Sequence, residues 1–120
     1  PNRYLAGITE VALKDHVGDK TNWRTMLKNE IVDENLVEWR ERLKQYIPDE
    51  AKDYFIETNT ETNLDFPVIK YPANPKSLNL IKTQVYTGKL SGIKGQYLIF
   101  EDDTVFNVRG NEGLVVEISL

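Results

Sequence analysis

The sequence has no cysteine, a single histidine and no long apolar run. Without cysteine the chain forms neither disulfides nor thiolate metal sites. A Ser/His/Asp triad would have to use His16, whose place near the end of a predicted helix favours an ordinary polar role. No segment reaches the roughly 18 apolar residues of a membrane span, and none resembles a signal peptide, so we expect a cytoplasmic protein without membrane contact.

The composition is that of a folded domain. Of the 120 residues 40% are hydrophobic, which is enough to bury a core. The net charge of −4 argues against a protein that coats nucleic acid with its whole surface. The charges are unevenly spread, because residues 66–100 contain five lysines and no acidic residue. This span predicts a locally basic face on an acidic protein.

Helical periodicity dominates the first half of the chain. Apolar residues at helical spacing predict a first helix over residues 3–17. A short helix around Trp23 follows, capped by Thr21 or Asn22. Asp33 is the expected cap of a third helix.

This third helix has the clearest apolar face in the sequence. We expect that face to be the main helical contribution to the core. It consists of Leu36, Trp39, Leu43, Tyr46 and Ile47. Pro48 ends the helix, and Pro48-Asp49-Glu50 starts another that ends near Ile56, because proline and acidic residues suit a first helical turn.

The apolar period changes from 3.6 to 2 in the second half. Asp102-Asp103 and residues 111–113 have the composition of hairpin turns, and prolines confine the first strand to an edge. The predicted strands cover residues 66–71, 85–90, 96–101, 104–108 and 114–118. The expected fold class is α+β, with three or four helices followed by a small antiparallel, barrel-like sheet of SH3-like or OB-like size.

A polar linker is the expected organisational boundary. Residues 58–63 offer no apolar side chain to bury, and several of their side chains compete for backbone hydrogen bonds. We therefore expect a helical part over residues 1–57 and a sheet part over residues 64–120.

The stretch Gly92-Ile93-Lys94-Gly95-Gln96 combines two glycines with a lysine. Glycine lets a backbone approach a ligand closely, and Lys94 between the glycines is expected to stand out from the sheet. With Tyr97 as a stacking platform, this composition fits a sheet that binds single-stranded nucleic acid. The alternative is ordinary turn or bulge chemistry, with the aromatic rings in the core.

A second candidate phosphate site lies at the start of the short helix. Lys20 and Arg24 flank a helix N-terminus whose free N–H groups could hold a phosphate. The alternative is a capping turn in which Trp23 fills the core. The full set of candidate nucleic-acid contacts is Lys20, Arg24, Lys89, Lys94, Tyr97 and Arg109.

Three segments of the sequence carry a family resemblance. The glycine-punctuated block over residues 92–110 and the segments 10–16 and 19–24 resemble the DUF2797 family of bacterial proteins. The resemblance implies a longer polypeptide with an upstream cysteine-rich, zinc-binding region and a segment like the first half of a GIY-YIG nuclease domain. The chain begins without methionine and is already helical in pattern at Leu5, so we expect it to be a fragment that contacts the missing N-terminal region.

The GIY-YIG similarity would make Glu10 a metal ligand, since the second half of such domains has a helix with one metal-binding glutamate. The alternative is an exposed helical pair with Lys14, worth about 0.3 to 0.5 kcal/mol. The tyrosines and the arginine of that nuclease pattern are missing, so we expect neither a nuclease nor a cofactor in this chain alone. The first hypothesis is a non-catalytic nucleic-acid-binding module. The alternatives are the C-terminal part of a metal-dependent nuclease, and a structural or partner-binding domain.

Overall fold

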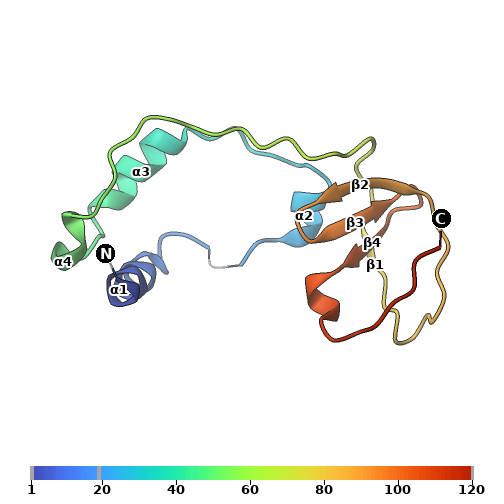
Figure 1. Ribbon diagram of the computed structural model, residues 1–120. Coiled ribbons are helices and arrows are strands. Elements are labelled where there is room, and N and C mark those ends of the chain that lie inside the picture. The colour runs from blue at the N-terminus through green and yellow to red at the C-terminus, as the bar shows by residue number, and fades with distance from the viewer. Residues whose placement is uncertain (1, 19, 120) are drawn as a thin grey trace. The chain divides into compact units, whose positions relative to one another are not determined.

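The computed structural model describes residues 2–18 and 20–119 and has α+β architecture (Figure 1). The helices are α1 (Arg3–Leu13), α2 (Trp23–Leu27), α3 (Leu36–Lys44) and α4 (Asp49–Lys52), with a 3-10 helix η1 (Arg109–Asn111) near the end of the chain. The strands are β1 (Lys76–Ser77), β2 (Leu90–Lys94), β3 (Tyr97–Phe100) and β4 (Thr104–Asn107).

The chain groups into two compact units. The first consists of residues 1–21 and 32–63, and the second of residues 22–31 and 64–120. The second unit therefore joins the sheet to α2, a helix from the first half of the sequence. It is also the less acidic unit, because it has eight Lys and Arg against seven Asp and Glu, whereas the first has seven against twelve.

Asparagine caps the longer helices of the first unit. The Asn2 side chain accepts a hydrogen bond from the Leu5 backbone N–H at 2.9 Å at the start of α1. The predicted Asp33 cap of α3 is wrong, since Asn35 accepts from the Glu38 N–H at 3.1 Å and donates to the Glu38 carboxylate at 3.2 Å. The cap therefore satisfies the Glu38 N–H, a helix-end donor, and lies two residues later than expected.

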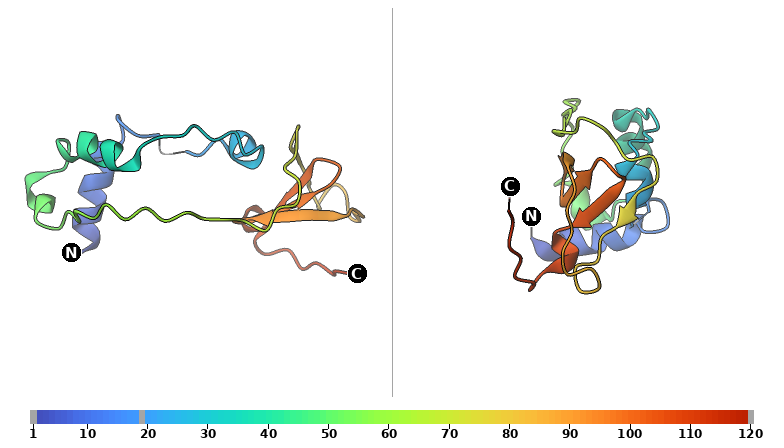
Figure 2. Two further views of the ribbon diagram at one scale, coloured as in Figure 1. Left: turned by 90° about the horizontal axis from the view of Figure 1, so that it is seen from above. Right: turned by 90° about the vertical axis from the view of Figure 1, so that its right-hand side faces the viewer.

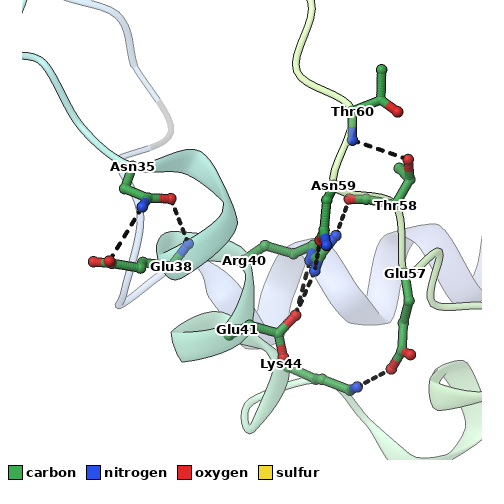
Figure 3. Close-up of polar contacts among 9 residues, drawn as sticks. All are labelled: Asn35, Glu38, Arg40, Glu41, Lys44, Glu57, Thr58, Asn59 and Thr60. Carbon is green, nitrogen blue, oxygen red and sulfur yellow. Dashed lines mark hydrogen bonds and ion pairs between the residues drawn. The ribbon is translucent and has the colours of Figure 1, made fainter.

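The apolar face of α3 is not the main helical contribution to the core, contrary to the prediction. No residue of α3 is fully buried, and Leu36 is 60% exposed. The helix is instead tied to residues 57–59 by polar contacts (Figure 3). Arg40 donates to the Thr58 carbonyl and to the Asn59 side chain, and Lys44 pairs with Glu57.

The sheet of the second unit is open and mixed, with strand order β1-β4-β3-β2 (Figure 1). Strand β1 runs parallel to β4, and the other pairs are antiparallel. The prediction of an antiparallel sheet is therefore wrong for β1, and the sheet is not closed into the expected barrel-like form. Of the predicted strands, 96–101 and 104–108 correspond to β3 and β4, whereas 85–90 contributes only Leu90, and residues 114–118 join no strand. Figure 2 shows this last segment leaving η1 as an extended chain.

Both hairpin turns use a residue in the left-handed region. Gly95 has a φ of 58° at the first position of the two-residue turn between β2 and β3, where a type II′ turn favours glycine. Asp103 has a φ of 70° in the turn between β3 and β4, as expected for the Asp102-Asp103 hairpin. The first turn consists of Gly95 and Gln96, so Lys94 belongs to β2 and not to the turn.

The predicted edge strand at residues 66–71 is reduced to a short irregular pairing along β2. Val68 bridges Gly92, the Ile69 N–H donates to the Ser91 carbonyl at 2.8 Å, and the Ile93 N–H donates to the Pro67 carbonyl at 3.0 Å. This segment therefore covers the outer edge of β2, with proline at an edge position as expected.

One face of the sheet forms the core of the second unit together with α2. Leu27 and Ile99 have no exposed surface and Val105 almost none, and Tyr97 is buried beside them. Trp23, Met26 and Val68 pack against this cluster. The helical contribution to the core thus comes from the five-residue helix α2 rather than from α3.

Candidate functional site

The two central residues of the predicted nucleic-acid site are buried. Tyr97 is 9% exposed and stacks on Trp23, with ring centroids 6.1 Å apart and planes inclined by 14°. A base has no access to a ring packed in this way. The expectation that Tyr97 offers a stacking platform is wrong, because its place in the strand alternation directs the ring toward α2.

Lys94 does not stand out from the sheet, contrary to the prediction. It is 7% exposed, and its Nζ donates to the Met26 carbonyl at 2.9 Å and to the Asn29 Oδ1 at 3.0 Å. The ring centroids of Phe66 and Tyr71 lie 5.6 and 5.1 Å from the same nitrogen. Burial lowers the pKa of Lys94, since the charged form loses solvation.

The Lys94 contacts fall on the C-terminal end of α2. Asn29 ends the helix in the left-handed conformation, with a φ of 59°. Its N–H donates to the Met26 carbonyl and the Glu30 N–H donates to the Thr25 carbonyl, the two bonds of a Schellman motif. A cation at this end complements the exposed carbonyls. Lys94 thus attaches α2 to the sheet and is not available to a phosphate.

The other candidate cations are scattered. Arg24 lies on α2 with its guanidinium carbon 4.3 Å from the centroid of the Trp23 ring, so it joins the layer formed by Trp23 and Tyr97. Lys89 pairs with Glu101 at 2.9 Å, and that hydrogen bond raises the pKa of Lys89. Arg109 is exposed in η1, and Lys20 is exposed in the first unit.

Glu10 is an exposed residue of α1. Among residues 2–18 and 20–119, no group of three or more His, Cys, Asp or Glu side chains could hold a metal ion. Glu10 and Lys14, the alternative helical pair, do not form an ion pair.

The carboxylates of the Asp102-Asp103 turn are both used within the fold. Asp102 accepts from the Tyr86 hydroxyl at 3.0 Å and from the Thr104 N–H at 3.0 Å. Asp103 accepts from the backbone N–H groups of Ala73 and Asn74 at 3.0 and 3.1 Å. The acidic pair is therefore a structural turn that anchors neighbouring loops.

Gly92 allows a close backbone approach, but the approaching segment is the protein's own edge segment at Val68 and not a ligand. A Cβ at this position would lie 2.6 Å from the Val68 Cα and 2.8 Å from its Cβ, well inside van der Waals contact. The space that we expected a ligand to use is filled by the edge segment. Glycine is required here so that Val68 can reach the core.

A continuous apolar row crosses the sheet on the face opposite to α2. Leu98 pairs with Ile93 on one side and with Phe106 on the other, and directly paired residues share a face. The Ile93 N–H bonds to Pro67, which extends the row onto the edge segment. Ile69 alternates with Pro67 along the edge segment, so it lies on this face too. Leu90 also lies on it, because the register shift in β2 pairs Leu90 with Phe100, which alternates with Leu98. We call these residues the open face: Pro67, Ile69, Leu90, Ile93, Leu98 and Phe106.

The open face is accessible at its β2 end. Ile69 is 92% exposed and Ile93 is 41% exposed. An open groove lies over residues 66–69 and 90–93, two segments that are hydrogen-bonded to each other. Leu98 and Phe106 are half-buried further along the sheet. The result is an apolar surface of the kind that marks an interaction site.

The sequence signal for this face is the unbroken apolar run Tyr97-Leu98-Ile99-Phe100. A strand with one solvated face alternates apolar and polar residues, whereas a strand covered on both faces does not. The sequence analysis considered only Tyr97 from this run and so missed the second face.

Among the described residues, no helix is long and apolar enough to cross a lipid bilayer. No curated protein and no solved structure matches the chain. The similarity to GIY-YIG nucleases is not supported by these comparisons. A family model described as "Protein of unknown function (DUF2797)" matches residues 1–116, and the chain therefore belongs to the DUF2797 family.

Proposed function

We propose that the chain is a protein-binding module whose second unit accepts an apolar partner on the open face. The observation that carries this proposal is the row Pro67, Ile93, Leu98 and Phe106, which is apolar across the edge segment and three strands. Covering a sheet face of this composition is favourable, because burying apolar surface contributes roughly 25 cal/mol per Å². Partner binding is the simplest use of such a face.

The polar surroundings of the open face support the same proposal. The residues that could carry chemistry nearby, Lys94 and Asp102, are engaged in hydrogen bonds within the fold. The groove over residues 66–69 and 90–93 is lined by apolar side chains and Ser91, whose hydroxyl donates to the Lys70 carbonyl at 2.7 Å. Apolar contact rather than polar recognition would therefore dominate binding.

Site-specific photo-cross-linking tests this proposal. A photoreactive residue at Ile69, expressed in the native cells, should give discrete cross-linked products, and Ile93→Asp in the same chain should remove them. Ile56 is the matched control, since it is a similarly exposed isoleucine in the first unit. Identical products from both positions, or products that survive Ile93→Asp, would contradict the proposal.

A second candidate is weak binding of single-stranded nucleic acid, now at different residues. Lys70, Lys76 and Lys82 are exposed, and none of the ion pairs in the described part of the chain involves them. Exposed lysines of this kind can neutralise phosphates without any aromatic platform. The salt dependence of binding tests this candidate.

A further inference from the structure

Phe100 lies on the same side of the sheet as the open face and is covered by Tyr86. It alternates with Leu98 along β3 and pairs with Leu90 of β2. The rings of Tyr86 and Phe100 meet edge to face, with centroids 4.9 Å apart and planes inclined by 72°. Tyr86 belongs to the loop between β1 and β2. A loop residue of the same chain therefore covers one end of the apolar side of the sheet.

A hydrogen bond holds the Tyr86 ring in this place. Its hydroxyl donates to the Asp102 carboxylate at 3.0 Å, and that carboxylate also accepts from the Thr104 hydroxyl at 2.9 Å. Burial raises the pKa of the Tyr86 phenol, because the ionised form has lost part of its solvation. A Cβ at Gly88 would lie 2.7 Å from the Tyr86 Cζ, so the missing side chain of Gly88 leaves the space that the ring occupies.

The loop around Tyr86 is held at both ends and at one point between them. Residues 79–83 form a turn closed by their own backbone hydrogen bonds, and the Lys89 carbonyl accepts from the Glu101 N–H at 3.0 Å. Among the described residues, the Tyr86 hydroxyl makes the only hydrogen bond between residues 84–88 and another segment. The other four residues of this span are exposed. The span can therefore move away from the sheet once Tyr86 is released.

We propose that residues 84–88 form a lid over Phe100, at the Leu90 end of the open face, and that Tyr86 is the latch that keeps this lid closed. The inference rests on the proposed function, since it names a regulation of the same surface. A partner can replace one ring contact and one hydrogen bond with its own, because both are interactions of ordinary strength. When Tyr86 turns away, the Phe100 ring becomes accessible and the apolar surface offered to the partner grows.

Gly88→Ala should open the lid while keeping every latch residue. The added methyl group meets the outer end of the Tyr86 ring, which is flexible and can turn away, so the sheet should remain undisturbed. The pKa of Tyr86 should then fall toward its ordinary value of 10.0 as the hydroxyl returns to water. A pH titration of isotope-labelled tyrosine by NMR measures this value. A Tyr86 pKa equal to that of the parent would overturn the latch.

Binding of the apolar dye anilinonaphthalene sulfonate measures the uncovered surface. Tyr86→Ala and Gly88→Ala should bind more dye than the parent, and Leu90→Asp in either chain should remove the gain, because Leu90 lies beside Phe100. Tyr86→Phe keeps the ring contact and should raise the open fraction by about two- to tenfold, the range of one hydrogen bond. Tyr54→Ala, at an exposed tyrosine of the first unit, is the control. Parent-level dye binding in both opening variants would contradict the lid.

Cross-linking in cells separates the lid from the proposed function. A photoreactive residue at Ile69 should give more Ile93-dependent product in the Gly88→Ala chain than in the parent, since the partner no longer competes with Tyr86. Unchanged yields would overturn the regulation and leave the proposed function intact. If neither chain gives Ile93-dependent products, the proposed function is wrong and this inference fails with it.

Discussion

The Lys94 ammonium donates a hydrogen bond of 2.9 Å to the Met26 carbonyl, 68 positions earlier in the sequence. This bond joins the last residue of β2 to the C-terminal turn of α2. It explains why a lysine between two glycines is buried. The side chain lies along the aromatic rings of Phe66 and Tyr71, and its charged end meets the helix carbonyls.

Replacing Lys94 by methionine should therefore loosen α2. The substitution keeps most of the side-chain volume but removes two charge-assisted hydrogen bonds, so we expect a loss of about 1 to 3 kcal/mol in the free energy of unfolding. Denaturant unfolding measures the loss, and hydrogen exchange of the α2 amides should show where it occurs. Lys82→Met, at an exposed lysine, is the control and should have little effect. Unchanged exchange in α2 would show that Lys94 does not hold it.

Leu27 and Trp39 should differ sharply when truncated to alanine. Leu27 has no exposed surface and belongs to the core cluster, so Leu27→Ala should cost about 2 to 5 kcal/mol. Trp39 is only half-buried, and its indole N–H donates to Glu34 at 2.8 Å. Trp39→Ala should cost clearly less than Leu27→Ala. Thermal unfolding of both variants checks the order, and a larger shift for Trp39→Ala would restore the α3 face as a core element.

Two glycine substitutions should change the free energy of unfolding in opposite directions. Gly92→Ala places a Cβ 2.6 Å from the Val68 Cα, a backbone atom that cannot give way cheaply, so we expect a loss of about 1 to 3 kcal/mol. Gly7 lies inside α1 with open space around its missing side chain, and Gly7→Ala should gain about 0.5 to 1 kcal/mol. Equilibrium unfolding measures both. A neutral Gly92→Ala would show that the edge segment is free to move away from β2.

Acid should weaken the Asp102 turn. Hydrogen bonding from the Thr104 N–H lowers the pKa of Asp102 below its ordinary value of 3.8, with a further contribution from the Tyr86 hydroxyl. The folded state therefore favours the ionised carboxylate. Its contribution to stability is fully present above about pH 3.8 and is lost as the pH falls through the lowered pKa. The free energy difference between the parent and Asp102→Asn should shrink over this window in unfolding experiments, and a pH-independent difference would contradict this linkage.

Nucleic-acid binding, if present, should not depend on Lys94. Each lysine that neutralises a phosphate on a single strand contributes about 0.7 to the slope of log affinity against log salt. Lys94→Met should leave the slope unchanged, whereas changing both Lys76 and Lys82 to methionine should reduce it by about 1.4. Fluorescence anisotropy of a labelled oligonucleotide over a salt series measures these slopes. No binding at low salt would remove this candidate function.

Local sequence patterns predicted the elements that local interactions decide. The short helix around Trp23, the helix ended by Pro48, β3, β4 and the Asp102-Asp103 hairpin all depend on spacing, caps or turn residues. Asn35 was missed as a cap because Asp33 and Asn35 have similar capping preferences, and only the contact with Glu38 distinguishes them.

Long-range packing decided what the patterns could not. The apolar stripe of α3 is as regular as that of a core helix. The core of the second unit nevertheless contains the much shorter α2, because Lys94 and Tyr97 lie against that helix. Residues 114–118 have strand propensity, but propensity does not supply a partner strand. The candidate cations were judged by residue type alone, which carries no information about which of them the fold buries.

The pairing of α2 with the sheet sets an order for biosynthesis. The ribosome makes Trp23 and Leu27 well before Ile99 and Val105, the strand residues that cover them. Until those strands emerge, the apolar side of α2 has no native partner in its unit, and the 32–63 segment must close as a loop before the unit can form. A chain cut within the 58–63 segment would leave the sheet without this helix. Folding of the second unit therefore waits for β4, however early its first helix is made.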